Sequence, residues 1–94
     1  MYYVYILHCS DGSFYTGHTR DIASRMAMHN KGEGPAYTAA RRPVTLSYAE
    51  SRATEQAAVR REEQIKRWSR AKKKALLEGD INKLKLLSRC RTTI

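Results

Sequence analysis

Two tyrosines and an arginine recur at a regular interval near the start of the chain. Tyr5 and Tyr15 lie ten residues apart, and Arg25 follows Tyr15 after another ten. A phenol with its ordinary pKa near 10 is a weak base unless nearby cations or a metal ion lower that pKa. We expect Arg25 and the net charge of +9 to lower it here. A guanidinium in this position can also bind a phosphate and offset charge in a transition state.

A glutamate pair later in the chain supplies the candidate metal ligand. Glu62 falls near Ala58 and Ile65 on the apolar face of the helix predicted around it. Glu63 turns outward. A carboxylate on an apolar face needs a partner, and we expect Glu62 to hold one Mg²⁺ (or Mn²⁺) ion completed by water and a substrate phosphate. The competing interpretation is an ion pair with Lys66, four residues further on.

Two histidines extend the set of candidate residues. His29 lies four residues after Arg25, so the two side chains share one helix face. An imidazole in this position can polarise water, donate to a phosphate or assist a leaving group. His18 directly follows Tyr15-Thr16-Gly17. For both histidines the competing interpretation is an ordinary side chain at the boundary of the fold.

Basic residues outnumber acidic ones by 18 to 9, and the sequence pI is near 9.9. Such a surplus favours a polyanionic partner, for which we expect nucleic acid, DNA before RNA. The densest basic run surrounds Trp68, and two further arginines lie in an earlier loop. The expected nucleic-acid contacts are His18, Arg41, Arg42, Lys66, Arg67, Arg70, Lys72, Lys73 and Lys74. The competing interpretation of the run is a solvated basic face.

The opening of the chain predicts a β-hairpin that positions the tyrosines. Residues 2–8 are aromatic and β-branched, which is typical of a buried strand. Asp11-Gly12 favours a tight turn, and residues 13–18 then form a second, antiparallel strand. Tyr5 and Tyr15 can project from the same face of such a hairpin if the register pairs them.

A loop and a third strand follow. Residues 32–43 are rich in glycine, proline and basic residues and indicate a functional loop. Residues 44–50 predict a strand in which Val44, Leu46 and Tyr48 face inward.

Capping residues delimit three helices. They are predicted from Asp21 to about Asn30, from Thr54 to about Trp68, and from Ser69 to Gly79. The element order is ββαβαα, which makes an α+β domain with a small antiparallel three-stranded sheet flanked by helices. We expect residues 1–79 to form this domain and residues 80–94 to form a short Leu-rich helical segment and a tail.

The lack of recognisable targeting signals and the two cysteines predict a cytoplasmic protein without a membrane partner. No stretch approaches the ~18 apolar residues that a membrane span requires, and the N-terminus lacks a secretory pattern. Cys9 and Cys90 lack the spacing of metal ligands, and we expect two reduced thiols.

Five short motifs occur in a characteristic order between residues 2 and 78. They are Tyr3-Val4-Tyr5, Tyr15-Thr16-Gly17, the Tyr37-Thr38 loop, Arg42-Pro43-Val44, and Arg61-Glu62 before Ile65-Lys66. In this order they resemble the GIY-YIG nuclease family, and within it the short stand-alone bacterial members. Tyr3 stands where the family name has glycine. The asparagine that larger members place beyond the glutamate helix has no counterpart in this sequence.

The resemblance implies a metal-dependent endonuclease that hydrolyses phosphodiester bonds in DNA, in repair or processing. It also implies that Tyr5 deprotonates the attacking water, Tyr15 hydrogen-bonds the scissile phosphate and Glu62 binds the metal. His18 falls where larger members often place a basic residue. Two alternatives stay open: a non-catalytic nucleic-acid-binding module with this fold, and an adaptor that binds a protein through the Leu-rich segment. We expect specificity to be slight or supplied by a protein partner.

Overall fold

Three strands form one antiparallel sheet in the order β2-β1-β3. β1 spans Tyr2–His8, β2 spans Phe14–Thr19 and β3 spans Thr45–Arg52. The computed structural model describes residues 1–79, so the predicted Leu-rich segment and tail at 80–94 lie outside the described residues. The predicted hairpin and the predicted three-stranded antiparallel sheet are confirmed.

Four helices complete the fold: α1 (Ile22–Asn30), α2 (Ala36–Ala39), α3 (Glu55–Lys66) and α4 (Arg70–Leu77). The three longer helices begin at the predicted caps. The side chains of Asp21, Thr54 and Ser69 each accept a hydrogen bond from a backbone N–H in the first turn. These bonds satisfy donors that the start of a helix leaves without partners. No helix within residues 1–79 is long and apolar enough to cross a membrane.

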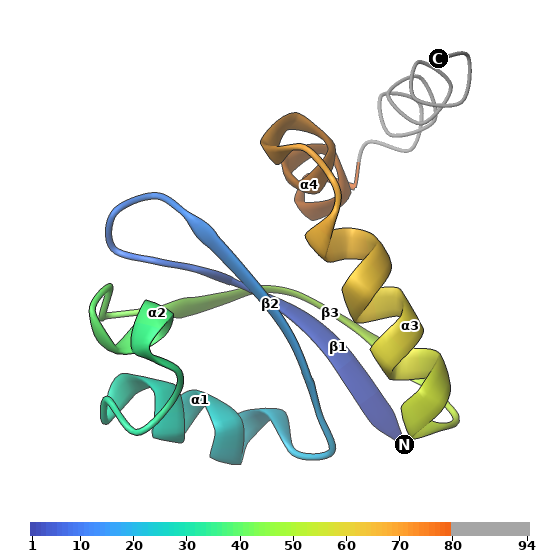
Figure 1. Ribbon diagram of the computed structural model, residues 1–94, viewed down its shortest axis with the longest axis horizontal. Helices are drawn as coiled ribbons and strands as arrows, with labels where there is room; N and C mark the ends of the chain where they lie inside the picture. Colours follow the sequence, from blue (N-terminus) through green and yellow to red (C-terminus); the bar gives the residue numbers. More distant parts are fainter. Residues whose placement is uncertain (80–94) are drawn as a thin grey trace.

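The sheet lies between two helical layers (Figure 1). α1 and α2 lie on one side, and α3 and α4 lie on the other. α3 contacts all three strands. β2 is an edge strand, paired only with β1, and it runs along the edge nearest the viewer.

The central strand β1 is apolar at successive positions because both of its faces are covered. Val4 and Ile6 are fully buried in a cluster with Ile65 of α3. Tyr5 and Leu7 point to the opposite face. The cluster there consists of Tyr5, Leu7, Cys9 and Val44, with Tyr15 and Met26 packed against it.

Strand β3 departs from the predicted alternation. Ile6 of β1 pairs with Tyr48. The next residue of β1, Leu7, pairs with Leu46, so Ser47 is an extra residue in β3. Such a bulge changes the face to which the neighbouring side chains point. Tyr48 packs on the α3 side, but Leu46 is 43% exposed, and its predicted inward position is wrong.

Replacing Ile65 with alanine tests the packing of α3 on the sheet. Ile65 is fully buried, and deleting such a side chain costs about 2–5 kcal/mol because part of the cavity remains. Leu46→Ala should cost less than about 1 kcal/mol, because an exposed side chain leaves no cavity. Urea denaturation followed by circular dichroism measures both losses. Equal losses in the two variants would contradict the open position of Leu46.

Candidate active site

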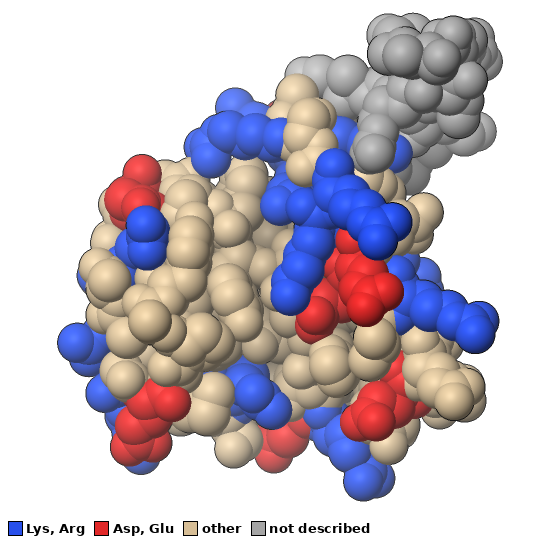
Figure 2. Space-filling view, in the orientation of Figure 1, with Lys and Arg blue, Asp and Glu red and all other residues tan. Residues whose placement is uncertain are grey.

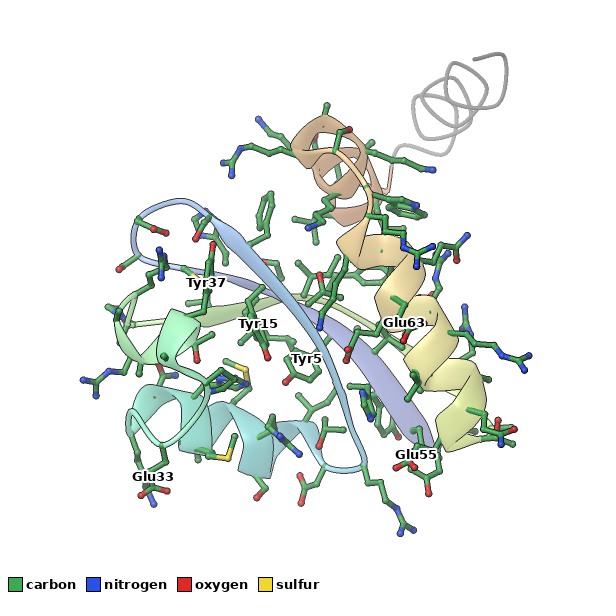
Figure 3. The ribbon with its side chains drawn as sticks, viewed as in Figure 1. Tyr5, Tyr15, Glu33, Tyr37, Glu55 and Glu63 are labelled. Atoms are coloured by element: carbon green, nitrogen blue, oxygen red, sulfur yellow. The ribbon has the colours of Figure 1, made fainter. Side chains whose placement is uncertain are left out.

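The two strand tyrosines lie on the same face of the sheet, in residue pairs that are two positions apart. Tyr5 pairs with Gly17, and Tyr15 pairs with Leu7. Residues that are directly opposite share a face, and so do residues two apart on one strand. Figure 3 shows Tyr37, Tyr15 and Tyr5 in a row on the α1–α2 side of β2. The tyrosines are thus diagonal neighbours and not a direct cross-strand pair.

Gly17 leaves the space through which the Tyr5 phenol passes. A Cβ atom on Gly17 would lie 2.5 Å from Tyr5 Oη and 2.7 Å from Tyr5 Cζ. Side-chain atoms do not pack this closely, so any residue other than glycine would displace the ring. The phenol therefore starts on the central strand and crosses β2 toward the edge of the sheet.

A buried chain of hydrogen bonds starts at the Tyr5 hydroxyl. Tyr5 Oη lies 3.1 Å from His29 Nε2, and His29 Nδ1 lies 2.9 Å from Thr38 Oγ1. The Thr38 hydroxyl donates to the carbonyl of Pro35 at 3.1 Å. Because its proton is used there, Thr38 accepts from His29 Nδ1–H. Nε2 of a neutral His29 is then the acceptor for the Tyr5 hydroxyl.

The segment that contains α2 encloses this histidine. His29 is 1% exposed and Thr38 is 0% exposed. A Cβ atom on Gly34 would lie 2.7 Å from His29 Nδ1, so Gly34 lets the backbone close over the imidazole. His29 is therefore a buried residue and not a histidine at the boundary of the fold. Both of its ring nitrogens have partners within the protein.

Burial changes the acid–base properties of the Tyr5–His29 pair. Burial is the largest effect on the phenol and raises the pKa of Tyr5 to about 12, with Tyr15 and Glu62 acting in the same direction. Arg25 opposes this rise but does not cancel it. Burial, followed by Arg25, lowers the pKa of His29 from its ordinary 6.5. The predicted lowering of the phenol's pKa is therefore wrong, because burial outweighs the nearby cation.

Tyr15 is held between two aromatic rings. It makes an edge contact with His29, with 5.5 Å between ring centroids, and stacks on Tyr37 at 6.0 Å. Arg41 Cζ lies 3.9 Å from the centroid of the Tyr37 ring, and Arg41 also donates to Asp11 at 2.9 Å. Within residues 1–79 the Tyr15 hydroxyl makes no hydrogen bond to the protein. That hydroxyl is available to a ligand.

Glu62 lies on the side of α3 that faces the sheet. Its Oε1 is 2.8 Å from His18 Nδ1, and its Oε2 is 3.0 Å from Lys66 Nζ. The Glu62 side chain is 14% exposed, whereas Glu63 is exposed, so the predicted orientations of the two glutamates are confirmed. The competing ion pair with Lys66 is also present. In the described part of the chain, no three His, Cys, Asp or Glu side chains form a ready metal-binding group.

Arg25 is half-buried on α1 beside the phenol. It lines a narrow gap between the side chains of Tyr5, Ile22 and Met26. Its charge affects the pKa of both Tyr5 and His29, which shows that it lies close to the pair. No acidic side chain within residues 1–79 forms an ion pair with it. The guanidinium can therefore accept an anionic ligand.

One of the predicted nucleic-acid contacts, Lys72, is buried. Lys72 is 6% exposed, and its Nζ lies 4.2 Å from the centroid of the Trp68 ring. An ammonium buried in this way contributes to packing and cation–π attraction. The predicted contact of Lys72 with phosphate is therefore contradicted by its burial.

Two of the other basic residues stabilise local structure. Arg70 donates to the carbonyl of Gly12 at 2.7 Å and lies over the Phe14 ring. Arg42 donates to the carbonyl of Ala39 at 3.0 Å. The exposed members of the basic run are Lys66, Arg67, Arg70 and Lys74, and Lys73 is half-buried. Figure 2 shows Lys and Arg side chains gathered over α4 and the adjoining end of α3, next to a patch of carboxylates.

Three positions in this site were not identified as site residues from the sequence. Thr38 orients the imidazole, Gly17 makes room for the phenol and Gly34 makes room for the histidine. The Tyr37-Thr38 and Tyr15-Thr16-Gly17 motifs contain two of the three, but motif membership does not say which side chain each residue contacts. Gly34 carried no signal beyond its place in a glycine-rich loop.

Comparison with known proteins identifies the family of the chain. The model of the GIY-YIG catalytic domain matches residues 1–75. The UPF0213 proteins of Halobacterium salinarum and Bacillus pumilus are 51% and 47% identical to this chain over 76 and 77 residues. These matches cover 81% and 82% of this chain and 99% and 79% of the two relatives.

A solved structure shows the same fold. The solution NMR structure of the UPF0213 protein of Bacillus halodurans matches with a TM-score of 0.55 and 41% sequence identity. The match covers 85% of this chain and 86% of that one. The chain therefore belongs to the GIY-YIG family, which is part of a nuclease superfamily.

Proposed function

We propose that this protein is an endonuclease that hydrolyses phosphodiester bonds in DNA with a divalent cation. One observation carries the proposal: the β2 edge brings together a buried Tyr5–His29 pair and an arginine without an acidic partner in the described residues. The carboxylate of Glu62 is close enough to this pair to affect the pKa of Tyr5. A base, a phosphate-binding cation and a metal ligand are the groups that metal-assisted phosphodiester hydrolysis requires.

Tyr5 and His29 act together as the general base. As the attacking water gives its proton to Tyr5 Oη, the phenol passes its own proton to His29 Nε2, 3.1 Å away. No free phenolate has to form, which matters because the pKa of Tyr5 is raised to about 12. Thr38 keeps His29 in the tautomer that leaves Nε2 free to accept.

Tyr15 and Arg25 hold the scissile phosphate. The Tyr15 hydroxyl donates to a non-bridging oxygen, and its ring is kept in place by Tyr37 and His29. Arg25 binds the same phosphate and offsets the negative charge that grows in the transition state. A clamp of this kind contributes to binding as well as to rate.

Glu62 is the residue that would hold the cation, one Mg²⁺ or Mn²⁺ ion. A single carboxylate fits Mg²⁺, which commonly takes its remaining ligands from water and substrate phosphate. Lys66 is 49% exposed and can move away from Oε2, while His18 can keep its hydrogen bond to Oε1 and orient the carboxylate. When bound, the ion supplies positive charge that polarises the phosphate and the attacking water.

A non-catalytic nucleic-acid-binding module is the second candidate. The observation that favours it is that both oxygens of Glu62 already have cationic or N–H partners. In such a module Glu62 would anchor α3 to β2, and the basic surface would bind nucleic acid without cutting it.

Glu62→Gln separates the two candidates. It should abolish cleavage, because an amide binds Mg²⁺ far more weakly than a carboxylate does. DNA affinity should stay close to that of the wild type. The assay uses linear, nicked, flapped and branched DNA, and RNA, with Mg²⁺ or Mn²⁺. Glu63→Gln makes the same charge change on the exposed side and should leave cleavage intact. Wild-type protein that binds but cuts none of these substrates would favour the module.

The pH dependence of cleavage tests the Tyr5–His29 relay. Only neutral His29 can accept the proton from Tyr5, and the pKa of His29 is lowered from 6.5. The single-turnover rate should therefore fall as pH drops through that lowered pKa and should stay level from there through neutral pH. Tyr5→Phe should lower the rate by roughly 10²–10⁴-fold while the fold is retained.

Variants at Thr38 provide the control for the relay. Thr38→Val removes the acceptor of His29 Nδ1–H at nearly constant volume, whereas Thr38→Ser retains a hydroxyl. The valine variant should lose rate, and NMR of its imidazole nitrogens should show the proton moving to Nε2. The serine variant should behave like the wild type. Full activity of Thr38→Val would rule out His29 as the proton acceptor.

Charge reversal on the exposed part of the basic run tests the nucleic-acid contacts. Arg67→Glu with Lys74→Glu should weaken DNA binding on every sequence alike, and the slope of log affinity against log salt should fall by ~0.9 per lost phosphate contact. Fluorescence anisotropy over a range of salt concentrations measures both. Lys31→Glu, an exposed substitution at the end of α1, is the control. Unchanged affinity in the double variant would show that this run only keeps the protein soluble.

A further inference from the structure

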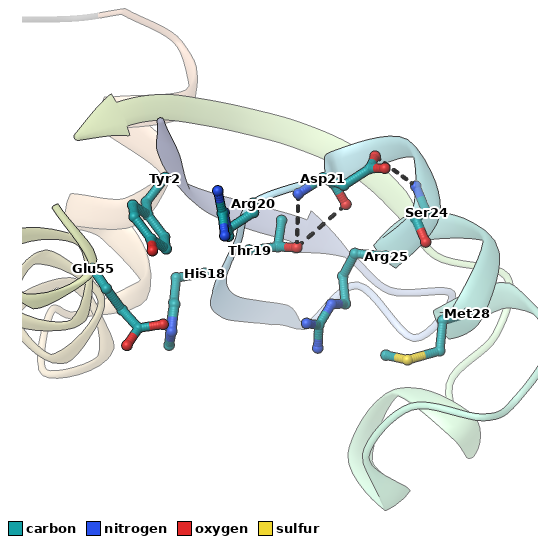
Figure 4. A pocket seen from close by; sticks show the side chains of 9 residues that line it. All are labelled: Tyr2, His18, Thr19, Arg20, Asp21, Ser24, Arg25, Met28 and Glu55. Carbon is teal, nitrogen blue, oxygen red and sulfur yellow. Dashed lines mark hydrogen bonds between the residues drawn. The ribbon is translucent and has the colours of Figure 1, made fainter. Parts of the chain in front are cut away.

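A hollow of about 440 Å³ opens on the surface directly beside the candidate active site. Figure 4 shows Tyr2 and Glu55 on one side of it, Arg25 and Met28 of α1 on the other, and the end of β2 between them. Arg25, on its lining, is also the proposed phosphate ligand. His18, which holds the carboxylate of Glu62, lines the hollow as well. The hollow is therefore continuous with the site where the scissile phosphate is expected.

The lining of the hollow suits a nucleobase. Arg20 Cζ lies 5.3 Å from the centroid of the Tyr2 ring, so a planar cation is held over an aromatic surface. Unpaired bases stack on arginine planes and on aromatic rings. Met28 on the opposite wall adds a polarisable apolar surface, and the Glu55 carboxylate can accept from an exocyclic amino group. The volume falls within the ~300–1,000 Å³ that small-ligand sites occupy.

The two ends of the hollow differ in the chemistry they offer. At the active-site end, Arg25 has no acidic partner within residues 1–79 and can bind a phosphate. At the far end, the pair of Tyr2 and Arg20 offers a stacking surface. A phosphate attached to a sugar and a base matches this order of groups.

We propose that this hollow binds the nucleotide next to the scissile phosphate, with its phosphate toward Arg25 and its base against the Arg20–Tyr2 pair. The proposal rests on the proposed function for the position of the scissile phosphate. It adds a base contact beside the cut, made by residues of β1, β2, α1 and α3. Stacking tolerates every base. This contact therefore selects unpaired nucleotides and does not select a particular base sequence.

NMR titration of the full 94-residue chain tests the site without requiring cleavage. One sample receives inorganic phosphate and a second receives a deoxynucleoside monophosphate, both without divalent metal. Within the hollow, phosphate should shift signals near Arg25 only. The nucleotide should also shift the backbone amides of Thr19 and Arg20, which line the hollow. Identical shifts with both probes, shifts confined to another surface, or no shifts with the nucleotide would each overturn the proposal.

A variant that fills the hollow provides the second measurement. Ser24 is exposed and lines the hollow, and Ala23 is exposed on the same helix but does not line it. Ser24→Trp should weaken nucleotide binding about tenfold, the effect of losing one base stack of roughly 1.4 kcal/mol, and should leave phosphate binding unchanged. Ala23→Trp should change neither. Equal nucleotide affinity in the two variants would overturn the proposal.

These outcomes are independent of catalysis. A protein that binds the nucleotide in the hollow but cuts no substrate would contradict the endonuclease proposal and still support this site. A protein that cuts DNA but shows no base-dependent shifts would contradict the site and leave the endonuclease proposal standing.

Discussion

The hydrogen bond between Tyr5 and His29 is the interaction on which the rest of the candidate site depends. It joins the central strand to α1 across 24 residues of chain, and both side chains are almost fully buried. The bond requires a glycine at position 17, because a Cβ atom there would lie 2.5 Å from the phenol oxygen. It also requires Thr38, which binds the other nitrogen of the imidazole. The acid–base properties of the Tyr5–His29 pair thus depend on residues outside the pair.

The site lies at an edge of the sheet because its parts come from both faces. Tyr5 and Tyr15 lie on the α1 face. His18 pairs with Val4 and so shares the α3 face with Glu62, to which it is bonded. β2 has a neighbour on one side only, so groups from both faces meet at its open edge. A chain of 94 residues has little interior for a deep pocket, and an edge site needs none.

Most of the fold could be predicted because its signals are local. The caps at Asp21, Thr54 and Ser69 each bond a backbone group within three residues, so a short stretch of sequence is enough to identify them. The predicted inward position of Leu46 is wrong because β3 contains a bulge. The bulge arises from the pairing of β3 with β1, and the alternation of residues within one strand carries no information about that pairing. A basic run predicts Lys72 at the surface, whereas in the folded protein Lys72 is buried and its Nζ lies 4.2 Å from the centroid of the Trp68 ring.

The sequence by itself determined the order of the three strands and the three longer helices, the family and the residue types available for chemistry, because these follow from patterns along the chain. It did not reveal α2, which lies in the segment 32–43 that was predicted to be a loop. Only the tertiary structure decided how those residues behave. Residue type and net charge suggested a lowered phenol pKa, whereas the folded protein raises the pKa of Tyr5 to about 12. Desolvation depends on every atom packed around a group, and for Tyr5 and His29 those atoms come from distant parts of the chain. The tautomer of His29 also depends on the tertiary structure, because the imidazole is bonded to Thr38 of α2, nine residues further along the chain.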